Sequence, residues 1–213
     1  MSIIRFIDVI EFLGTFAFAI SGIRLASAKR FDWFGALVIG FVTAVGGGTT
    51  RDLMLNQTPF WMLNPIYLIC TSSALLIVII YRKILVHLNN TFFIFDAIGL
   101  ALFTVVGMEK TLGCGFPYWV AMIMGIITGA VGGIIRDILI NEIPLIFRKE
   151  IYALACLVGG IFYWLCDLAG LPKEVSQMTA ALTVVFTRII AVKYQISLPT
   201  LGDDENSNTS SPD

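Results

Sequence analysis

One stretch of this chain occurs twice. Residues 40–59 and 125–144 align without a gap, and the residues they share stand 85 positions apart, as Arg51 and Arg136 do. The shared pairs are Gly40/Gly125, Thr43/Thr128, Gly47/Gly132, Gly48/Gly133, Arg51/Arg136, Asp52/Asp137, Asn56/Asn141 and Pro59/Pro144. The same offset relates Tyr67 to Tyr152 and places Glu11 opposite Asp96. An internal repeat therefore runs from about residue 8 to 82 and again from about 93 to 168.

The composition is that of a membrane protein. Hydrophobic residues make up 57% of the chain, charged residues only 14%, and the mean hydropathy is +0.87. A soluble domain is about 45–50% apolar. So few charges cannot cover a soluble globule of 213 residues, but they suit a protein whose outer surface faces lipid. The net charge of −1 argues against nucleic acid as a partner, because nucleic-acid binding needs a basic face.

Apolar runs of about 17–25 residues predict seven transmembrane helices. They fall at about 7–25, 33–54, 62–81, 92–109, 117–140, 150–168 and 175–194. Each repeat contains three of these spans, and the seventh, about 175–194, stands alone. We therefore expect an all-α membrane protein with a single transmembrane domain over residues 1–195. The polar, acidic segment 196–213 has nothing to bury and is expected to be a disordered tail.

Basic residues between the spans predict the orientation in the membrane. One side collects Lys29, Arg30, Arg82, Lys83, Arg148, Lys149 and Lys193, whereas the other has Arg5, Lys110 and Lys173. By the positive-inside rule the first side is cytoplasmic, so the N-terminus lies outside and the C-terminus inside. Because each repeat has an odd number of spans, the second copy must enter the membrane the opposite way up. The pattern predicts an inverted-topology repeat.

Consecutive glycines interrupt the second and fifth spans. Gly46, Gly47 and Gly48 are matched in the second copy by Gly132 and Gly133. Glycine costs about 1 kcal/mol relative to alanine inside a helix, so these runs predict a bend or an unwound turn. Broken helices at matching places in two inverted halves indicate a substrate or ion site near the membrane midplane. The alternative is that the glycines only let helices pack closely.

Thr43 and Thr128 precede the glycine runs on the same helices. We expect these two threonines, with the backbone of Gly46–Gly48 and of Gly132 and Gly133, to form the polar lining of an ion pathway. No Thr-Val-Gly-Tyr-Gly loop and no ring of acidic residues is present, so a channel of this kind would select poorly among cations.

An Arg-Asp pair follows each glycine run, at Arg51-Asp52 and Arg136-Asp137. Charges inside a span normally face the bundle interior. Neighbouring residues point about 100° apart on a helix, so the members of a pair are not expected to bind each other. We expect instead that each arginine is buried and contacts freed carbonyls or the acid of the other repeat. The alternative places both pairs at the headgroup boundary as anchors.

The residues indicate neither an enzyme nor a metal site. The four cysteines stand singly, without C-x-x-C spacing, and His87 is the only histidine. No nucleophile and base, and no cluster of metal ligands, can be assembled from such residues. We therefore expect no catalytic residues, no bound metal and no cofactor.

With these features the sequence resembles the trimeric intracellular cation (TRIC) channels, and specifically their prokaryotic relatives, a bacterial group also described as glycine transporters. The resemblance covers about residues 5–195 and rests on the spans, the two repeats and the glycine runs followed by Arg-Asp. It implies a homotrimer in the inner (plasma) membrane, in contact with lipid. Every protomer would hold its own pore, permeable to K⁺ and, less selectively, to Na⁺.

A second function remains open at this point. A secondary transporter or carrier for a small amino acid such as glycine would also use broken helices. The N-termini of half-helices attract a carboxylate, while freed carbonyls coordinate a cation. The pattern of residues is compatible with both a channel and a carrier.

Overall fold

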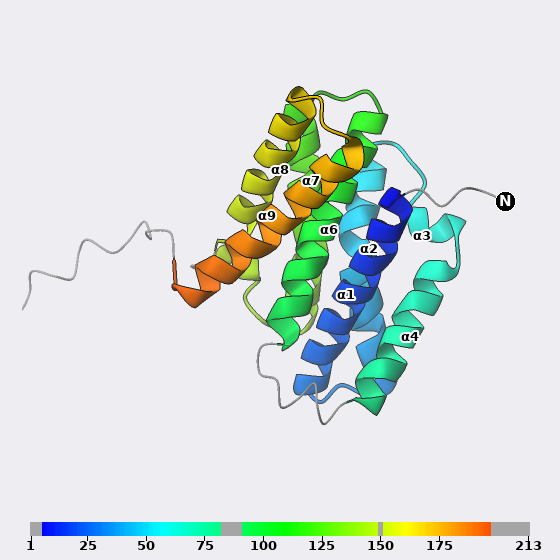
Figure 1. Ribbon diagram of the computed structural model, residues 1–213. Helices are drawn as coiled ribbons and strands as arrows, with labels where there is room; N and C mark the ends of the chain where they lie inside the picture. The colour runs from blue at the N-terminus through cyan, green and yellow to red at the C-terminus, as the bar shows by residue number, and fades with distance from the viewer. Residues whose placement is uncertain (1–5, 82–90, 149–150, 197–213) are drawn as a thin grey trace, which may run out of the picture.

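The computed structural model describes residues 6–81, 91–148 and 151–196 and shows a bundle of α-helices (Figure 1). The helices are α1 (Phe6–Ala28), α2 (Trp33–Met54), α3 (Phe60–Leu63), α4 (Ile66–Ile80), α6 (Thr91–Gly113), α7 (Tyr118–Leu139), α8 (Ala153–Leu168) and α9 (Lys173–Lys193), with a 3₁₀ turn η1 (Leu145–Phe147) between α7 and α8. The expected disordered tail lies outside the described residues, apart from Ile196.

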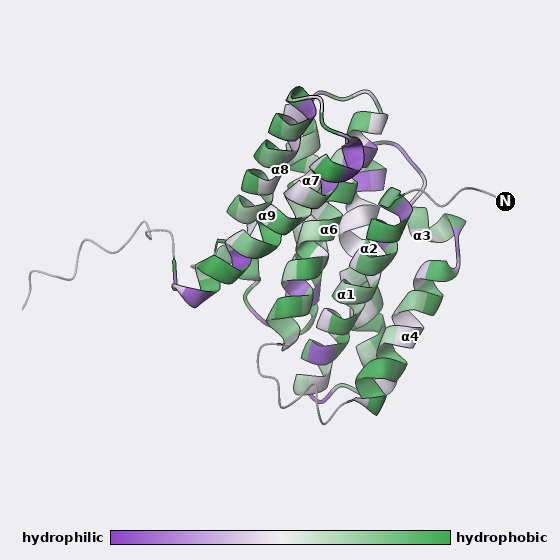
Figure 2. Ribbon diagram, viewed as in Figure 1, coloured by the Kyte–Doolittle hydropathy of each residue, from purple (hydrophilic) through white to green (hydrophobic). Residues whose placement is uncertain are grey.

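Five of the described helices are long and apolar enough to cross a membrane: α1, α2, α6, α7 and α9. The other two predicted spans correspond to α4 and α8, apolar helices of 15 and 16 residues, which is shorter than the predicted spans. Hydrophobic residues cover most of the helical surface, and hydrophilic residues gather toward helix ends and connections (Figure 2). The chain is an all-helical membrane protein.

Four helices form the centre of the bundle. α1 packs against α2 and α6, and α7 packs against α2 and α6. α4 flanks this centre beside α1, while α8 and α9 pack against each other on the opposite side (Figure 1). The core combines small, aliphatic and aromatic residues, and Phe18 stacks on Phe103 with the ring centroids 5.4 Å apart.

The expected break in α2 and α7 is not present, which corrects the prediction of an unwound turn. Each helix is continuous over 22 residues, through Gly46–Gly48 in α2 and through Gly132 and Gly133 in α7. The glycines instead remove side chains where another helix comes close. A Cβ atom on Gly132, for example, would lie 2.3 Å from a backbone carbonyl oxygen of α2. Close packing was the alternative interpretation of these glycines.

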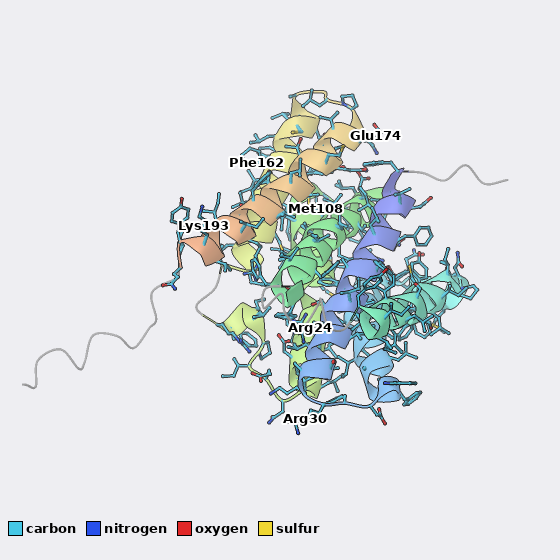
Figure 3. The ribbon with its side chains drawn as sticks, turned by 60° about the horizontal axis from the view of Figure 1, so that its bottom comes forward. Arg24, Arg30, Met108, Phe162, Glu174 and Lys193 are labelled. Carbon is cyan, nitrogen blue, oxygen red and sulfur yellow. The ribbon has the colours of Figure 1, made fainter. Side chains whose placement is uncertain are left out.

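The repeat is visible in the contacts. Gly40 in α2 packs on Ile23, and a Cβ added there would lie 3.2 Å from the Ala19 carbonyl oxygen. The equivalent glycine, Gly125 in α7, packs on Met108, and its Cβ would lie 2.9 Å from the Thr104 carbonyl oxygen. Figure 3 shows Met108 in α6, in the middle of the molecule. The packing of α1 on α2 is thus reproduced, 85 residues later, by α6 on α7.

Polar residues set the helix ends. The Asp32 carboxylate caps α2 by accepting a hydrogen bond of 2.6 Å from the Gly35 amide. Both α2 and α7 are followed by an asparagine in the left-handed region, Asn56 with φ 55° and Asn141 with φ 57°. Asparagine tolerates this conformation better than most residues with a side chain. Each asparagine turns the chain so that the next proline can begin a short helix.

Basic residues near the helix ends and connections lie at both ends of the bundle. At one end Glu142 binds Lys29 at 2.5 Å and Arg148 at 3.3 Å, which joins the α1–α2 turn to the segment after α7. The hydrogen bond and charge of Lys29 lower the pKa of Glu142. Lys110 and Lys173 share a cavity elsewhere, at the end where α1 begins. Arg5, Arg82, Lys83 and Lys149 lie outside the described residues.

Candidate functional site

α2 and α7 meet backbone to backbone at the two glycine runs. A Cβ atom on Gly47 would lie only 2.0 Å from the Thr128 carbonyl oxygen. The equivalent contact in the other direction is also present: a Cβ atom on Gly132 would lie 2.3 Å from the Thr43 carbonyl oxygen. Neither contact leaves room for a side chain. These four residues, which we call the α2–α7 crossing, are where the backbones of the two repeats come close together.

The threonines at the crossing present carbonyl groups rather than hydroxyl groups to the opposite helix. The Thr43 hydroxyl donates to the Ile39 carbonyl at 2.6 Å, and the Thr128 hydroxyl donates to the Met124 carbonyl at 2.6 Å. Both side chains are 1% exposed and pack toward Gly22 and Gly107 of the neighbouring helices. Thr43 and Thr128 therefore face the crossing with their backbone, while their hydroxyl groups bond within their own helices.

The other predicted glycines have different neighbours. A Cβ on Gly46 would lie 3.1 Å from the Ile135 side chain, so this position has more room than Gly47. Gly48 packs on the ring of Phe60, with a Cβ only 2.4 Å from the ring. Gly133 lies beside the Tyr152 hydroxyl group and the Arg136 guanidinium group. Only Gly47 and Gly132 form the crossing itself.

Arg51 is buried and binds its own neighbour in the sequence. Its Nε donates to Asp52 Oδ1 at 2.8 Å, and Nη2 makes an ion-pair contact of 2.7 Å with the same oxygen. The arginine is 0% exposed. Asp52 Oδ2 accepts from the Phe60 amide at 2.9 Å. This carboxylate therefore joins the end of α2 to the start of α3.

Arg136 repeats this arrangement and adds to it. Its Nε donates to Asp137 Oδ1 at 2.8 Å, and Asp137 Oδ2 accepts from the Leu145 amide at 3.1 Å. Its Nη1 also donates to Asp96 at 2.6 Å and to the Ser21 hydroxyl oxygen at 3.0 Å. Arg136 and Asp96 are both 0% exposed. One buried arginine thus holds two buried carboxylates.

These contacts correct the expected pairing across the repeats. Each arginine binds the adjacent aspartate, because its long side chain can fold back along the helix although the two Cβ atoms point apart. Among the described residues, Arg136 makes a hydrogen bond to the first repeat at Ser21, which offers a hydroxyl group rather than an acid. Burial of both arginines is also incompatible with the alternative of anchors at the headgroup boundary.

Sequence reasoning gave no role to the acids of α1 and α6, Glu11 and Asp96. Glu11 is 5% exposed and binds Lys110 Nζ at 2.5 Å and the Tyr67 hydroxyl group at 3.2 Å. Asp96 binds Arg136 instead. The sequence did contain a signal for these contacts, because an acidic residue within an apolar span normally has a buried partner. Their places 85 residues apart also marked them as equivalent.

Another buried arginine lies in α9. Arg188 is 0% exposed, and its Nη1 donates to the Ile151 carbonyl at 3.2 Å. Its guanidinium group lies 4.9 Å from the ring centroid of Phe93 and 4.8 Å from that of Tyr152. This residue joins α9 to the second repeat. A charge in the last apolar span could have predicted such a contact.

Comparison with known proteins identifies the family. A family model described as glycine transporter matches residues 8–83 and again residues 93–167, which are the two halves of the repeat. A solved TRIC trimeric intracellular cation channel orthologue from Rhodobacter sphaeroides is 33% identical, with a TM-score of 0.84 over 89% of this chain and 98% of that chain. The chain belongs to the TRIC family.

Other TRIC family members agree over nearly the whole chain. The inner membrane protein YadS of Escherichia coli K12, from the group UPF0126, is 40% identical over 200 residues, which are 92% of this chain and 97% of that protein. A second solved structure, from work on conductance through TRIC cation channels, is 34% identical in sequence. Its TM-score is 0.81 over 92% of this chain and 97% of that one. The similar solved structures are ion channels and not enzymes.

Among the described residues, no group of three or more His, Cys, Asp or Glu side chains is arranged to hold a metal ion. The four cysteines are free and lie apart from the α2–α7 crossing. The groups that face the crossing are backbone carbonyls and glycines, because both threonine hydroxyl groups donate to carbonyls of their own helices. Such groups can accompany a permeating ion, but they supply no nucleophile or general base.

Proposed function

We propose that this protein is a monovalent cation channel, permeable to K⁺ and less selectively to Na⁺, with a pathway inside each protomer of a homotrimer. The observation that carries the proposal is the α2–α7 crossing. There, two carbonyl-bearing backbone segments from equivalent helices meet in the interior of a fold shared with TRIC cation channels. An ion passing along this contact would meet Thr43 and Thr128 carbonyl oxygens, the ligand type that replaces cation hydration in selective pores.

The tight crossing corresponds to a closed conformation. A Cβ atom already has no space at Gly47 or Gly132, so a hydrated ion has none either. Conduction would require α2 and α7 to separate there. Two carbonyl groups form an incomplete coordination shell, so we expect selection among monovalent cations to be weak.

The remaining parts of the proposal concern the membrane. We place seven spans in the inner membrane. Five of them are the long helices. The other two are shorter: α4 preceded by α3, and α8 preceded by η1. The two repeats then have opposite orientations, with the N-terminus outside and the C-terminus in the cytoplasm. The reciprocal contacts of Gly47 and Gly132 support such an inverted repeat, because a two-fold axis in the membrane plane exchanges them.

A liposome measurement tests the proposed function. Liposomes that contain only this protein should release K⁺ under an imposed potential, at a rate that follows the potential. The same vesicles should show no accumulation of radiolabelled glycine above that of protein-free vesicles. Glycine uptake without K⁺ flux would contradict the channel and support the carrier that the family model's description suggests.

A further inference from the structure

A cavity opens at the end of the bundle where α1 and α9 begin. It has a volume of about 590 Å³ and lies between α1, α3, α4, α6 and α9. We call it the Glu109 vestibule. Its charged and hydrogen-bonding residues include Asp8, Glu11, Tyr67, Glu109, Lys110 and Lys173. Figure 3 shows that Glu174, next to Lys173, lies at the opposite end of the molecule from Arg30.

Among the described residues that line the Glu109 vestibule, acidic side chains outnumber basic ones. Asp8, Glu11 and Glu109 supply three carboxylates, whereas Lys110 and Lys173 supply two ammonium groups. The Glu11 carboxylate and the Lys110 ammonium group lie 2.5 Å apart and neutralise each other. Lys110 is held there further, since its Nζ lies 5.0 Å from the centre of the Phe60 ring. This ion pair contributes little field to the cavity.

Glu109 is held by neutral donors. Its Oε1 accepts from the Tyr163 hydroxyl group and, at 2.7 Å, from the Gln177 side-chain amide. Both donors are buried, at 1% and 5% exposed, and they come from α8 and α9. Hydrogen bonds from neutral groups fix the position of a carboxylate but leave its charge in place. The Glu109 carboxylate therefore places a negative charge at a fixed position in the wall of the vestibule.

We propose that Glu109 sets the cation preference of this channel by attracting hydrated monovalent cations into the vestibule. A charged wall in a narrow cavity with low-dielectric surroundings raises the local concentration of counter-ions. It also repels anions, as acidic rings do in cation channels. The inference rests on the proposed channel function. The carbonyl groups of the α2–α7 crossing do not explain how the channel selects cations over anions. The inference assigns that selection to Glu109.

The test is the substitution Glu109→Gln, measured as single-channel current in planar bilayers. The glutamine oxygen can still accept from Tyr163 and Gln177, so the change removes the charge and keeps the hydrogen bonds. We expect the K⁺ over Cl⁻ permeability ratio and the K⁺ conductance at about 0.1 M KCl to fall about two-fold or more. At about 1 M KCl, where the Debye length is only about 3 Å, the two conductances should converge.

The matched control is Asp167→Asn. Asp167 lies at the same end of the bundle and also accepts from a tyrosine hydroxyl group, that of Tyr118, but it does not line the vestibule. This variant should keep the wild-type K⁺ over Cl⁻ permeability ratio and the wild-type K⁺ conductance at both salt concentrations. An unchanged permeability ratio in Glu109→Gln, or an equal fall in Asp167→Asn, would overturn the inference. The absence of K⁺ current in the wild-type protein would instead refute the channel function itself.

A second variant keeps the inference testable if Glu109→Gln does not fold. Glu109→Cys, in a chain that also carries Cys114→Ser, can be modified with anionic or cationic methanethiosulfonate reagents. The anionic adduct should raise the K⁺ conductance at low salt relative to the unmodified cysteine, and the cationic adduct should lower it. Equal conductance with the two adducts would show that charge at position 109 has no effect on permeation.

Discussion

Gly47→Ala should strongly destabilise the protein, although it adds a single methyl group. The new Cβ would lie 2.0 Å from the Thr128 carbonyl oxygen and 2.9 Å from its carbon, both backbone atoms of α7. A backbone cannot move aside as a flexible side chain can, so the two helices must separate. We expect a loss of about 3 kcal/mol, at the upper end of the overpacking range. Thermal unfolding of the purified protein in detergent measures it.

The neighbouring glycine gives the control. In Gly46→Ala the new Cβ would meet the end of the Ile135 side chain at 3.1 Å and the Gly132 Cα at 3.5 Å. The side chain can yield, and alanine favours a helix by roughly 1 kcal/mol over glycine. Gly46→Ala should therefore unfold within a few degrees of the wild type. Similar losses from both substitutions would mean that the α2–α7 crossing is not the tight contact.

Arg136→Ala should be the most damaging of the charge substitutions. It removes the common partner of Asp96 and Asp137, and both acids are buried. Breaking a buried ion pair costs about 3–5 kcal/mol. Arg51→Ala should cost less, because among the described residues that arginine pairs with one acid, Asp52. Thermal unfolding, with trimer recovery on size exclusion, ranks the variants.

Two further variants separate ion pairing from general damage. Arg148→Ala removes an exposed arginine that binds Glu142, and surface pairs contribute only about 0–1 kcal/mol. Asp96→Asn combined with Arg136→Ala should recover about 0.5–3 kcal/mol of the loss, since one uncompensated charge disappears. Purely additive losses in the double variant would contradict a direct contact between Asp96 and Arg136.

Much of the fold could be predicted from the sequence, because apolar runs and repeat spacing are local signals. The second predicted span, 33–54, coincides with α2. The third was less accurate: it was predicted at 62–81, but the chain forms α3, turns at Asn64 and Pro65, and then forms α4. Proline lacks an amide donor and disfavours helix in the preceding residue, so it divides this run.

The site was harder to predict because its contacts depend on distances between helices. A run of glycines looks the same in the sequence whether it breaks a helix or allows the backbone of a neighbouring helix to pack closely against it. Only the approach of Thr128 to Gly47 distinguishes the two. The arginine contacts were missed for a related reason. Helical spacing gives the direction of a Cβ atom, but it does not give the position of a guanidinium group four bonds further along the side chain.

Recording from mixed trimers tests the central claim most directly, that each chain contains its own cation pathway. Wild-type subunits would be assembled with Gly46→Leu subunits, whose added side chain lies beside the crossing at a position with more room than Gly47, after the variant alone has been shown to form trimers without K⁺ current. If each protomer conducts alone, the conductance should fall through three graded levels as blocked subunits replace wild-type ones. Complete loss of current from a single Gly46→Leu subunit would instead indicate one pore shared by the assembly, and it would contradict a pathway along α2 and α7.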